Sequence, residues 1–258
     1  MTTIQTESIG EMLRGWRQRR KLSQLELSAS AEVSSRHLSF LETGRSQPSR
    51  EMIERLSEQL DVPLRERNQM LLSAGFAPQY AHRGFNSPEL LSISRAFSTI
   101  LDAHLPNPAL VLDRWWDVVD RNSATDILLD GCAAELLDPP VNAIRLTLHP
   151  DGLASRISNL GQWRAHLLTQ LRSRFARTGD DRLRRLLEEV LEYPGENAGT
   201  PARTDVVVPL QLRVGATELS FFSIAASVES ATDITIDELQ IEAFYPADEA
   251  TLNALRIS

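Results

Sequence analysis

The stretch SQLELSASAEVSSRHLSFLETGRSQPS, residues 23–49, decides the fold of the N-terminal part of the chain. Ser23 followed three residues later by Glu26 is a capping box, in which two side chains satisfy the first free amides of a helix. After the break at AEVSS, Leu38 and Leu41 lie three residues apart and give a second helix its buried face. The stretch therefore predicts two short helices joined by a tight turn.

The flanking residues continue this helical pattern. Apolar residues between Ile9 and Trp16 recur at the spacing of one helix face, and Ser8 precedes them as a candidate N-cap. Either Ser34 or Ser35 can cap the helix that contains Leu38 and Leu41. Two further amphipathic segments follow at residues 49–60 and 64–75. The first part of the chain is thus predicted to be an all-α unit of five helices that contains a helix-turn-helix.

This pattern resembles the xenobiotic-response-element family of bacterial and phage regulators, the repressor-and-Cro type, over about residues 8–75. The resemblance implies a lambda-repressor-like domain that binds a double-stranded DNA operator. The positions that carry it are Ser23, Gln24, Val33, Leu38, Leu41, Glu42, Gly44 and Arg45.

Two positions depart from the family pattern. Ser28 stands where the family favours Ala, and its hydroxyl can bond back to its own helix. Glu32 stands where the family favours Gly, which places a side chain at a left-handed turn position at a cost of about 1 kcal/mol. We therefore expect a slightly remodelled turn.

The second helix of the motif should present its polar side to DNA, because Leu38 and Leu41 take the opposite side. The side chains expected at base edges are Ser35, Arg36, His37 and Ser39. Arg36 matters most, since a guanidinium can donate two hydrogen bonds to O6 and N7 of guanine. The residues expected at phosphates are Gln24, Ser34, Arg45 and Arg50. One such motif buries little DNA, so we expect a homodimer on two half-sites about one helical turn apart.

The chain is long enough for a second domain. It has 258 residues, of which 42% are hydrophobic, and the segment FAPQYAHRGFNSP at residues 76–88 has the composition of a linker. We therefore predict domains at residues 1–84 and 85–258. Residues 1–83 hold 12 Lys and Arg against 10 Asp and Glu, whereas the remainder carries a net charge of −10. An acidic second domain can limit non-specific binding to DNA.

The second domain mixes helical and strand periods. A long amphipathic helix is expected at residues 88–105, and shorter or longer helices at 122–129, 141–148, 160–178 and 180–193. Strands are expected at 109–113, 116–121, 204–215, 216–227 and 234–245. This order predicts an α+β domain with helices on one face of an antiparallel sheet.

Beyond residue 88 the sequence resembles the ligand-binding domain of MmyB-like regulators, a PAS-like fold. The resemblance runs through VLDRWWDVVDRN (111–122), the segment 142–168, PLQLR (209–213), ELSF (218–221) and IEAFYPADEATLNAL (241–255). It departs at residues 189–203 and 228–235, where loops differ. It implies an apolar pocket between sheet and helices, in which some relatives hold a long-chain fatty acid or similar lipid.

The residues themselves supply a candidate pocket wall, because apolar side chains on facing strands and helices can enclose a small ligand. These residues are Leu112, Trp116, Val118, Leu128, Leu146, Trp163, Leu167, Phe221, Phe222 and Ile241. Each one taken singly is more often an ordinary core residue. A fatty-acid carboxylate would need a cation or an amide, for which Arg114, Arg121, Arg164 and Asn122 are equal candidates.

Several function classes have no support in the sequence. It has no GxSxG, Walker or HExxH motif, its five histidines have no metal-ligand spacing, and Cys132 is the only cysteine. We expect no enzyme activity, no metal and no cofactor, apart from a bound fatty acid as effector. With no signal peptide and no membrane-spanning stretch, a cytoplasmic location is expected.

The sequence thus predicts a transcriptional regulator that binds operator DNA through its first domain and a small apolar ligand through its second. One alternative is a DNA-binding adaptor whose second domain binds another protein and no ligand. Another is an enzyme fused to a DNA-binding domain, which the missing catalytic motifs disfavour.

Overall fold

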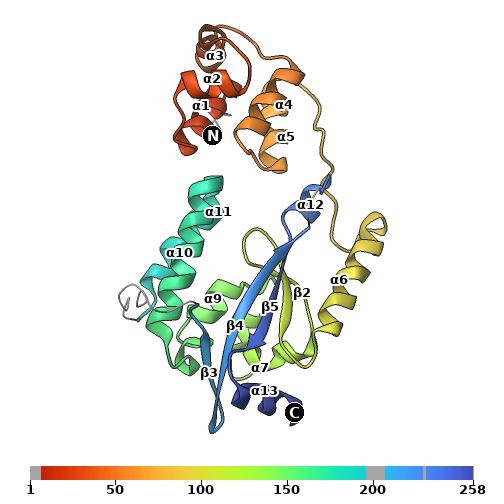
Figure 1. The fold of residues 1–258 in the computed structure, drawn as a ribbon, viewed down its shortest axis with the longest axis vertical. Helices are drawn as coiled ribbons and strands as arrows, with labels where there is room; N and C mark the ends of the chain where they lie inside the picture. Colours follow the sequence, from red (N-terminus) through yellow and green to blue (C-terminus); the bar gives the residue numbers. More distant parts are fainter. Residues whose placement is uncertain (1–6, 196–206, 229–230, 258) are drawn as a thin grey trace. The chain divides into compact units, whose positions relative to one another are not determined.

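The computed structural model describes residues 7–195, 207–228 and 231–257, which form two compact units (Figure 1). The first unit runs to His82 and also takes in Ala176–Thr178 and Ala231–Ile234. The second unit comprises the other described residues. Each unit has its own buried apolar core, so the two-domain architecture follows from the sequence as expected.

The first unit is a bundle of five helices, as predicted. They are α1 (Ile9–Arg19), α2 (Gln24–Ser30), α3 (Ser35–Glu42), α4 (Arg50–Gln59) and α5 (Leu64–Ser73). Leu13 and Leu38 are fully buried between them, as is Ile53. Helices α1 and α3 approach closely at Gly10, where a Cβ atom would lie 2.5 Å from the carbonyl oxygen of Leu41. The bundle places α2 and α3 in the helix-turn-helix arrangement.

Capping side chains set the helix boundaries. The predicted box of Ser23 with Glu26 caps α2, and the predicted N-cap Ser8 caps α1, where it forms a second box with Glu11. Of the two candidates for α3, Ser34 is the cap, and its hydroxyl accepts the amide of His37 at 3.1 Å. The turn between α2 and α3 places Glu32 at φ 53°, the left-handed conformation predicted from the missing glycine.

The second unit is built on one curled antiparallel sheet with the strand order β2-β1-β5-β4-β3. The strands are β1 (Ala109–Leu112), β2 (Val118–Arg121), β3 (Leu210–Val214), β4 (Thr217–Ser227) and β5 (Gln240–Pro246). The last strand begins later than predicted, because Ile234–Asp237 forms the short helix α12. An apolar alternation of only four residues does not distinguish a strand from one helical turn.

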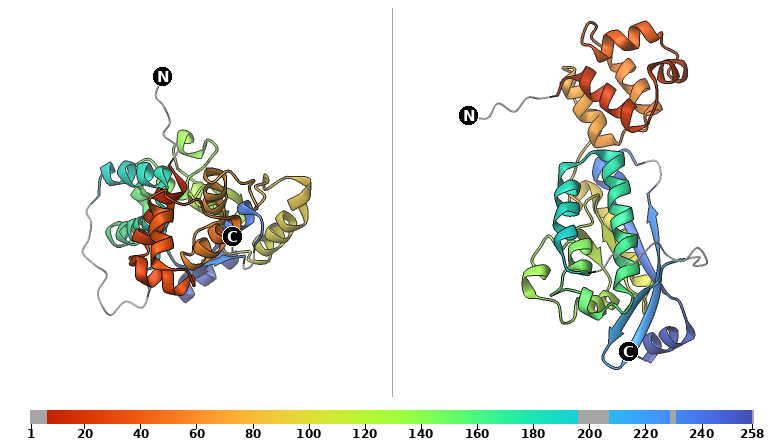
Figure 2. Two further views of the ribbon diagram at one scale, coloured as in Figure 1. Left: turned by 90° about the horizontal axis from the view of Figure 1, so that it is seen from above. Right: turned by 90° about the vertical axis from the view of Figure 1, so that its left-hand side faces the viewer.

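The other helices of this unit surround the sheet. They are α6 (Leu91–Ala103), α7 (Asp126–Leu129), α8 (Ala134–Leu137), α9 (Ala143–Leu148), α10 (Leu160–Thr178), α11 (Asp181–Glu192) and α13 (Glu249–Ile257). Figure 2 shows α10 and α11 side by side along the sheet. The prediction that helices lie on one face only was wrong. Helix α6 lies on the opposite face from α10 and α11 (Figure 1), and Ser98 in α6 donates to Asp120 of β2 at 3.0 Å.

The strand register separates the two faces of the sheet. Leu110 pairs with Glu242, and Ala225 pairs with the same glutamate on the other side, so these side chains share the inner face toward α10. Ile241 pairs with Val111 and Ala226 on the outer face, the face of α6. This alternation decides which apolar residues can reach the interior between the sheet and α10.

Candidate DNA-binding surface and ligand cavity

Helix α3 presents Arg36 to solvent, opposite its buried leucines. The guanidinium carbon of Arg36 lies 5.4 Å from the centre of the Phe40 ring, and that of Arg45 lies 5.9 Å from the same ring. Contact with the same aromatic ring restrains both arginine side chains, but an uncharged ring does not neutralise their positive charges. Arg36 on α3 and Arg45 just beyond its end are therefore both available to an anionic partner.

A buried ion pair holds α3 against α1 and α2. Arg17 donates to both carboxylate oxygens of Glu42, at 2.6 and 2.9 Å, and Gln24 donates to the same carboxylate at 2.7 Å. Burial by itself would raise the pKa of Glu42, but the hydrogen bonds from Arg17 and Gln24 outweigh burial and hold the pKa below its usual value. The orientation of α3 thus depends on the triad of Arg17, Gln24 and Glu42.

Four predicted DNA contacts have partners inside the first unit. The Gln24 amide belongs to the triad, Ser34 caps α3, and Ser35 shares a hydrogen bond of 2.7 Å with Ser28. Arg50 donates to the carbonyl oxygen of Ala77 at 2.9 Å. The capping role of Ser34 was one of the two predicted for this helix, whereas the partners of Gln24, Ser35 and Arg50 were not predicted from the sequence.

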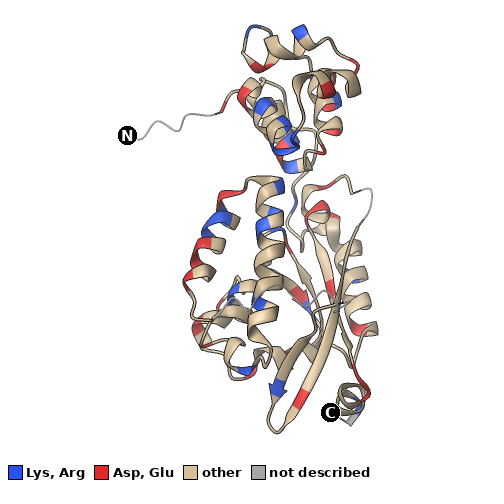
Figure 3. Cartoon of the chain, turned by 60° about the vertical axis from the view of Figure 1, so that its left-hand side comes forward, with Lys and Arg blue, Asp and Glu red and all other residues tan. Residues whose placement is uncertain are grey.

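The remaining predicted contacts lie on α3 itself or close to its end. His37 and Ser39 are half-buried, whereas Arg36 and Arg45 are exposed. Ser28 bonds back to the carbonyl oxygen of Leu25 at 2.9 Å, as its position suggested. Basic and acidic residues are interspersed over the first unit (Figure 3), in keeping with its small net charge. The exposed arginines of the first unit are therefore interspersed with acidic side chains rather than gathered on one broad basic face.

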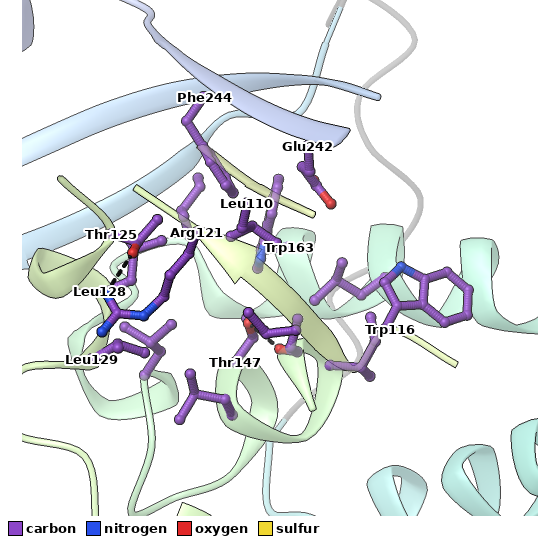
Figure 4. Close-up of a pocket in the computed structure, with 17 residues that line it drawn as sticks. Leu110, Trp116, Arg121, Thr125, Leu128, Leu129, Thr147, Trp163, Glu242 and Phe244 are labelled. Atoms are coloured by element: carbon purple, nitrogen blue, oxygen red, sulfur yellow. Dashed lines mark hydrogen bonds between the residues drawn. The ribbon is translucent and has the colours of Figure 1, made fainter. Parts of the chain in front are cut away.

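The second unit contains an apolar cavity between the inner face of the sheet and helices α7, α9 and α10 (Figure 4). Its empty volume of about 690 Å³ includes the space that opens to solvent at the mouth. The lining residues are Leu110, Trp116, Val118, Arg121, Thr125, Leu128, Leu129, Ala143, Ile144, Leu146, Thr147, Leu153, Trp163, Leu167, Leu210, Glu242 and Phe244.

Six of the ten predicted wall residues line this cavity: Trp116, Val118, Leu128, Leu146, Trp163 and Leu167. The other four, Leu112, Phe221, Phe222 and Ile241, do not. Phe222 and Ile241 lie on the outer face because strand side chains alternate, and Phe222 stacks on Tyr245 at 5.4 Å. Leu112 and Phe221 lie on the inner face but are fully buried in the packed core beside the cavity.

Part of the wall was not predicted from the sequence. Leu110 lies two residues before Leu112 and Phe244 lies three residues after Ile241, so the strand period could have found both once the register was known. Thr147 and Ile144 come from α9, whose inward side the helical spacing around Leu146 indicated. Nothing in the sequence pointed to Glu242 as an inward carboxyl.

The structure separates the four candidates for a carboxylate partner. Arg121 lines the cavity, donates to Thr125 at 2.9 Å and pairs with Asp126 at 2.5 Å. Arg114 pairs with Glu238 at 2.6 Å, and Arg164 donates to the carbonyl oxygen of Val190 at 2.8 Å. Asn122 binds three backbone groups, those of Leu101, Asn107 and Ala109. Of the four, Arg121 is the one that lines the cavity.

The turn between β1 and β2 places Trp116 in the cavity wall. Its backbone is strained at Trp116, and the charged side chains of Arg174 and Asp113 hold it in place. Trp116 has φ 64°, a conformation that bulky residues rarely adopt, and the Arg174 guanidinium lies 3.6 Å from its ring centre. Asp113 accepts the amides of Trp115 and Asp117. Burial raises the pKa of Asp113 to about 6 despite these hydrogen bonds. Backbone strain that the surrounding interactions hold in place is typical of binding sites.

Within residues 7–195, 207–228 and 231–257, no helix is long and apolar enough to cross a membrane. In the same ranges, no group of three or more histidine, cysteine or acidic side chains could hold a metal ion.

A helix-turn-helix unit joined to a unit with an apolar cavity defines a class, the DNA-binding transcriptional regulators with a ligand-binding domain. Comparison with known families agrees with this class. Residues 93–257 match the MmyB-like transcription regulator ligand binding domain, and residues 13–67 match a helix-turn-helix family. The chain therefore belongs to the MmyB-like transcription regulators, a family that points to regulation rather than catalysis.

Individual relatives support the same class. HTH-type transcriptional regulators of Mycobacterium tuberculosis and Mycobacterium bovis are 29% identical over 132 residues, which are 51% of this chain and 44% of each relative. The transcriptional regulator ClgR of Mycobacterium tuberculosis is 36% identical over 75 residues, 29% of this chain and 64% of ClgR. The chain thus spans less than half of the first relatives' length.

Proposed function

We propose that the protein is a homodimeric regulator whose affinity for its operator changes when a fatty acid or related lipid enters the cavity of the second unit. The observation that carries this proposal is the apolar cavity itself, walled by Leu146, Trp163 and Leu167 among others. An aliphatic chain gains free energy by leaving water for such a wall. Of the candidate cations, Arg121 is the one that lines the cavity, where a ligand carboxylate would join or replace its partner Asp126.

On the DNA side, Arg36 reads a base pair and Arg45 binds a phosphate. Arg36 leaves α3 on its solvent side, where a guanidinium can donate two hydrogen bonds to guanine. Arg45 lies just beyond the end of α3, near the place where a DNA backbone would pass. Ser39 and His37 contribute further contacts along the same helix.

The dimer is supported by an apolar stripe on the outer face of the second unit. Ile93 and Ile100 lie one helical repeat apart on α6 and are 38% and 50% exposed, and Ile224 on β4 is 50% exposed. Ser98, on the opposite flank of α6, points toward β2, so the two isoleucines point toward β5 and β4. A second copy of the chain would bury this stripe and set the spacing of two helix-turn-helix units.

The proposal requires that the ligand distinguish two states of the protein, because a ligand with equal affinity for both shifts nothing. Native mass spectrometry of the purified full chain should show a dimer with bound lipid. Operator affinity should then differ between lipid-free protein and protein saturated with palmitic acid. Equal affinity in the two conditions would contradict a sensor, and any lipid would then be structural.

A cavity-filling variant sharpens this test. Leu167→Trp should occupy part of the cavity, reduce lipid uptake and abolish the effect of lipid on operator binding. The matched control is Leu191→Trp, since Leu191 is 41% exposed on α11 and does not line the cavity. If both variants respond to palmitic acid as the unaltered protein does, the cavity is not the site.

A further inference from the structure

The wall of the cavity contains an indole N–H that an aliphatic chain cannot satisfy. Trp163 is 4% exposed, and its Nε1–H has no hydrogen-bond partner among the described residues. The hydroxyls of Thr125 and Thr147, which also line the cavity, each donate to a backbone carbonyl of their own segment at 2.6 Å. A buried donor without a partner costs free energy, so a ligand that brings an acceptor to Trp163 binds with an advantage.

A carboxyl group lies on the same wall. Glu242 is on the inner face of β5, in register with Leu110 and two residues from Phe244. Burial raises the pKa of Glu242, and a hydrogen bond with Ser223 and the charge of Arg174 offset this only in part. Figure 4 shows Glu242 and Trp163 among the side chains that surround the cavity. A mostly apolar site therefore offers one fixed donor and one acid.

Trp163 and Glu242 together favour a ligand oxygen that belongs to a hydroxyl group. A plain hydrocarbon chain brings neither a donor nor an acceptor, and a carboxylate brings only acceptors, so it can bond Glu242 only when Glu242 is protonated. A hydroxyl has one donor and two acceptor positions. It can accept from Trp163 and donate to ionised Glu242, or accept from both groups when Glu242 is protonated.

We propose that the cavity selects an aliphatic acid that carries a hydroxyl group on its chain, and that Trp163 and Glu242 recognise this hydroxyl. This inference rests on the proposed function, because it takes the same cavity as the binding site. It adds the chemical class of the ligand: a hydroxy fatty acid binds more tightly than the unsubstituted acid of the same length.

The test compares palmitic acid with hydroxypalmitic acids that carry the hydroxyl at carbon 2, 3 or 16, by titration calorimetry on the delipidated full chain. At least one hydroxy acid should bind about tenfold more tightly than palmitic acid, the effect of one satisfied buried hydrogen bond. Trp163→Phe and Glu242→Leu should each reduce this preference to less than threefold, where the preference is the ratio of the two affinities measured in the same variant. Glu242→Gln keeps a donor and an acceptor and should retain the preference.

The control for changes in packing is Leu146→Met, which alters the same wall while conserving volume and should leave the preference intact. If no hydroxy acid is preferred, or if the preference survives both Trp163→Phe and Glu242→Leu, the inference is wrong although the cavity still binds lipid. If neither palmitic acid nor any hydroxy acid binds, the proposed function fails together with it. The two failures are therefore distinguishable.

Discussion

The two units of the protein have different interiors. In the first unit, Leu13, Leu27, Leu38, Ile53 and Leu56 are completely buried, and the side chains that can meet DNA lie on the outside. In the second unit, the core residues surround an apolar cavity that opens to solvent. A domain that binds on its surface can fill its core, whereas a domain that binds in its interior must give up packing contacts there.

The second unit offsets this loss with buried polar interactions around the cavity. Asn122 bonds three backbone groups, and Arg114 pairs with Glu238 and Asp180 at 2.6 and 3.3 Å. Arg164 donates to the end of α11. Such groups stabilise only while every partner is present. The first unit has comparable interactions in the triad of Glu42 and in Asn68, which is buried and bonds three backbone groups of Gln79 and Tyr80.

The largest effect is expected from breaking that triad. Glu42→Ala leaves Arg17 buried without its carboxylate and should destabilise the first unit by about 3–5 kcal/mol. Hydrogen exchange of the full chain, read separately in α1–α3 and in the sheet, measures the loss. Glu58→Ala, at an exposed position of α4, is the control. A loss below about 1 kcal/mol would show that the triad orients α3 without stabilising it.

The same triad has a pH signature. Because the folded pKa of Glu42 lies below its usual value of 4.5, its contribution is present above that pH and is lost as pH falls through the folded pKa. The exchange protection of α3 should therefore decrease in acid more steeply in the unaltered chain than in Glu42→Ala.

The cost of replacing a buried leucine by alanine should differ between the cores of the two units. Leu56→Ala in the filled core should cost about 3–5 kcal/mol, whereas Leu146→Ala in the cavity wall should cost about 2 kcal/mol. The second side chain has fewer neighbours to lose, since one side of it faces empty space. Hydrogen exchange in each unit gives both values. Equal costs would mean that the cavity closes around the missing side chain.

A smaller effect is expected at the DNA surface. Arg36→Ala should weaken binding to the cognate operator by about 1–3 kcal/mol and relax the preference at one base pair, with unchanged stability. Fluorescence anisotropy with the operator and with single-base variants measures both. Arg55→Ala, an exposed change on α4, should leave binding as it is. Equal losses on cognate and random DNA would remove Arg36 from base recognition.

The smallest effect is expected at Arg45. A phosphate contact releases counterions without reading bases, so Arg45→Ala should weaken all DNA alike and reduce the salt slope of binding by about one unit. Titrations at several salt concentrations give the slope for the unaltered chain, for this variant and for Arg55→Ala. An unchanged slope would contradict the phosphate role.

Local sequence signals predicted the first unit well because its structure is built from local interactions. The capping boxes at Ser8 and Ser23 and the left-handed Glu32 depend on residues within one or two turns. The alternate roles of Gln24 and Ser35 were missed because their partners, Glu42 and Ser28, lie 18 and 7 residues away in the chain. Spacing along one helix does not reveal such pairings.

The sequence by itself determined the two-domain organisation, the helix-turn-helix and most of the strands of the second unit, since period and capping act over a few residues. Tertiary structure decided which side of each strand faces the cavity. The register that pairs Leu110 with Glu242 brings an acid inward and sends Ile241 outward. Because side chains alternate with a period of two, a shift of one residue would exchange the two faces, and only the long-range pairing of β1, β5 and β4 sets that shift.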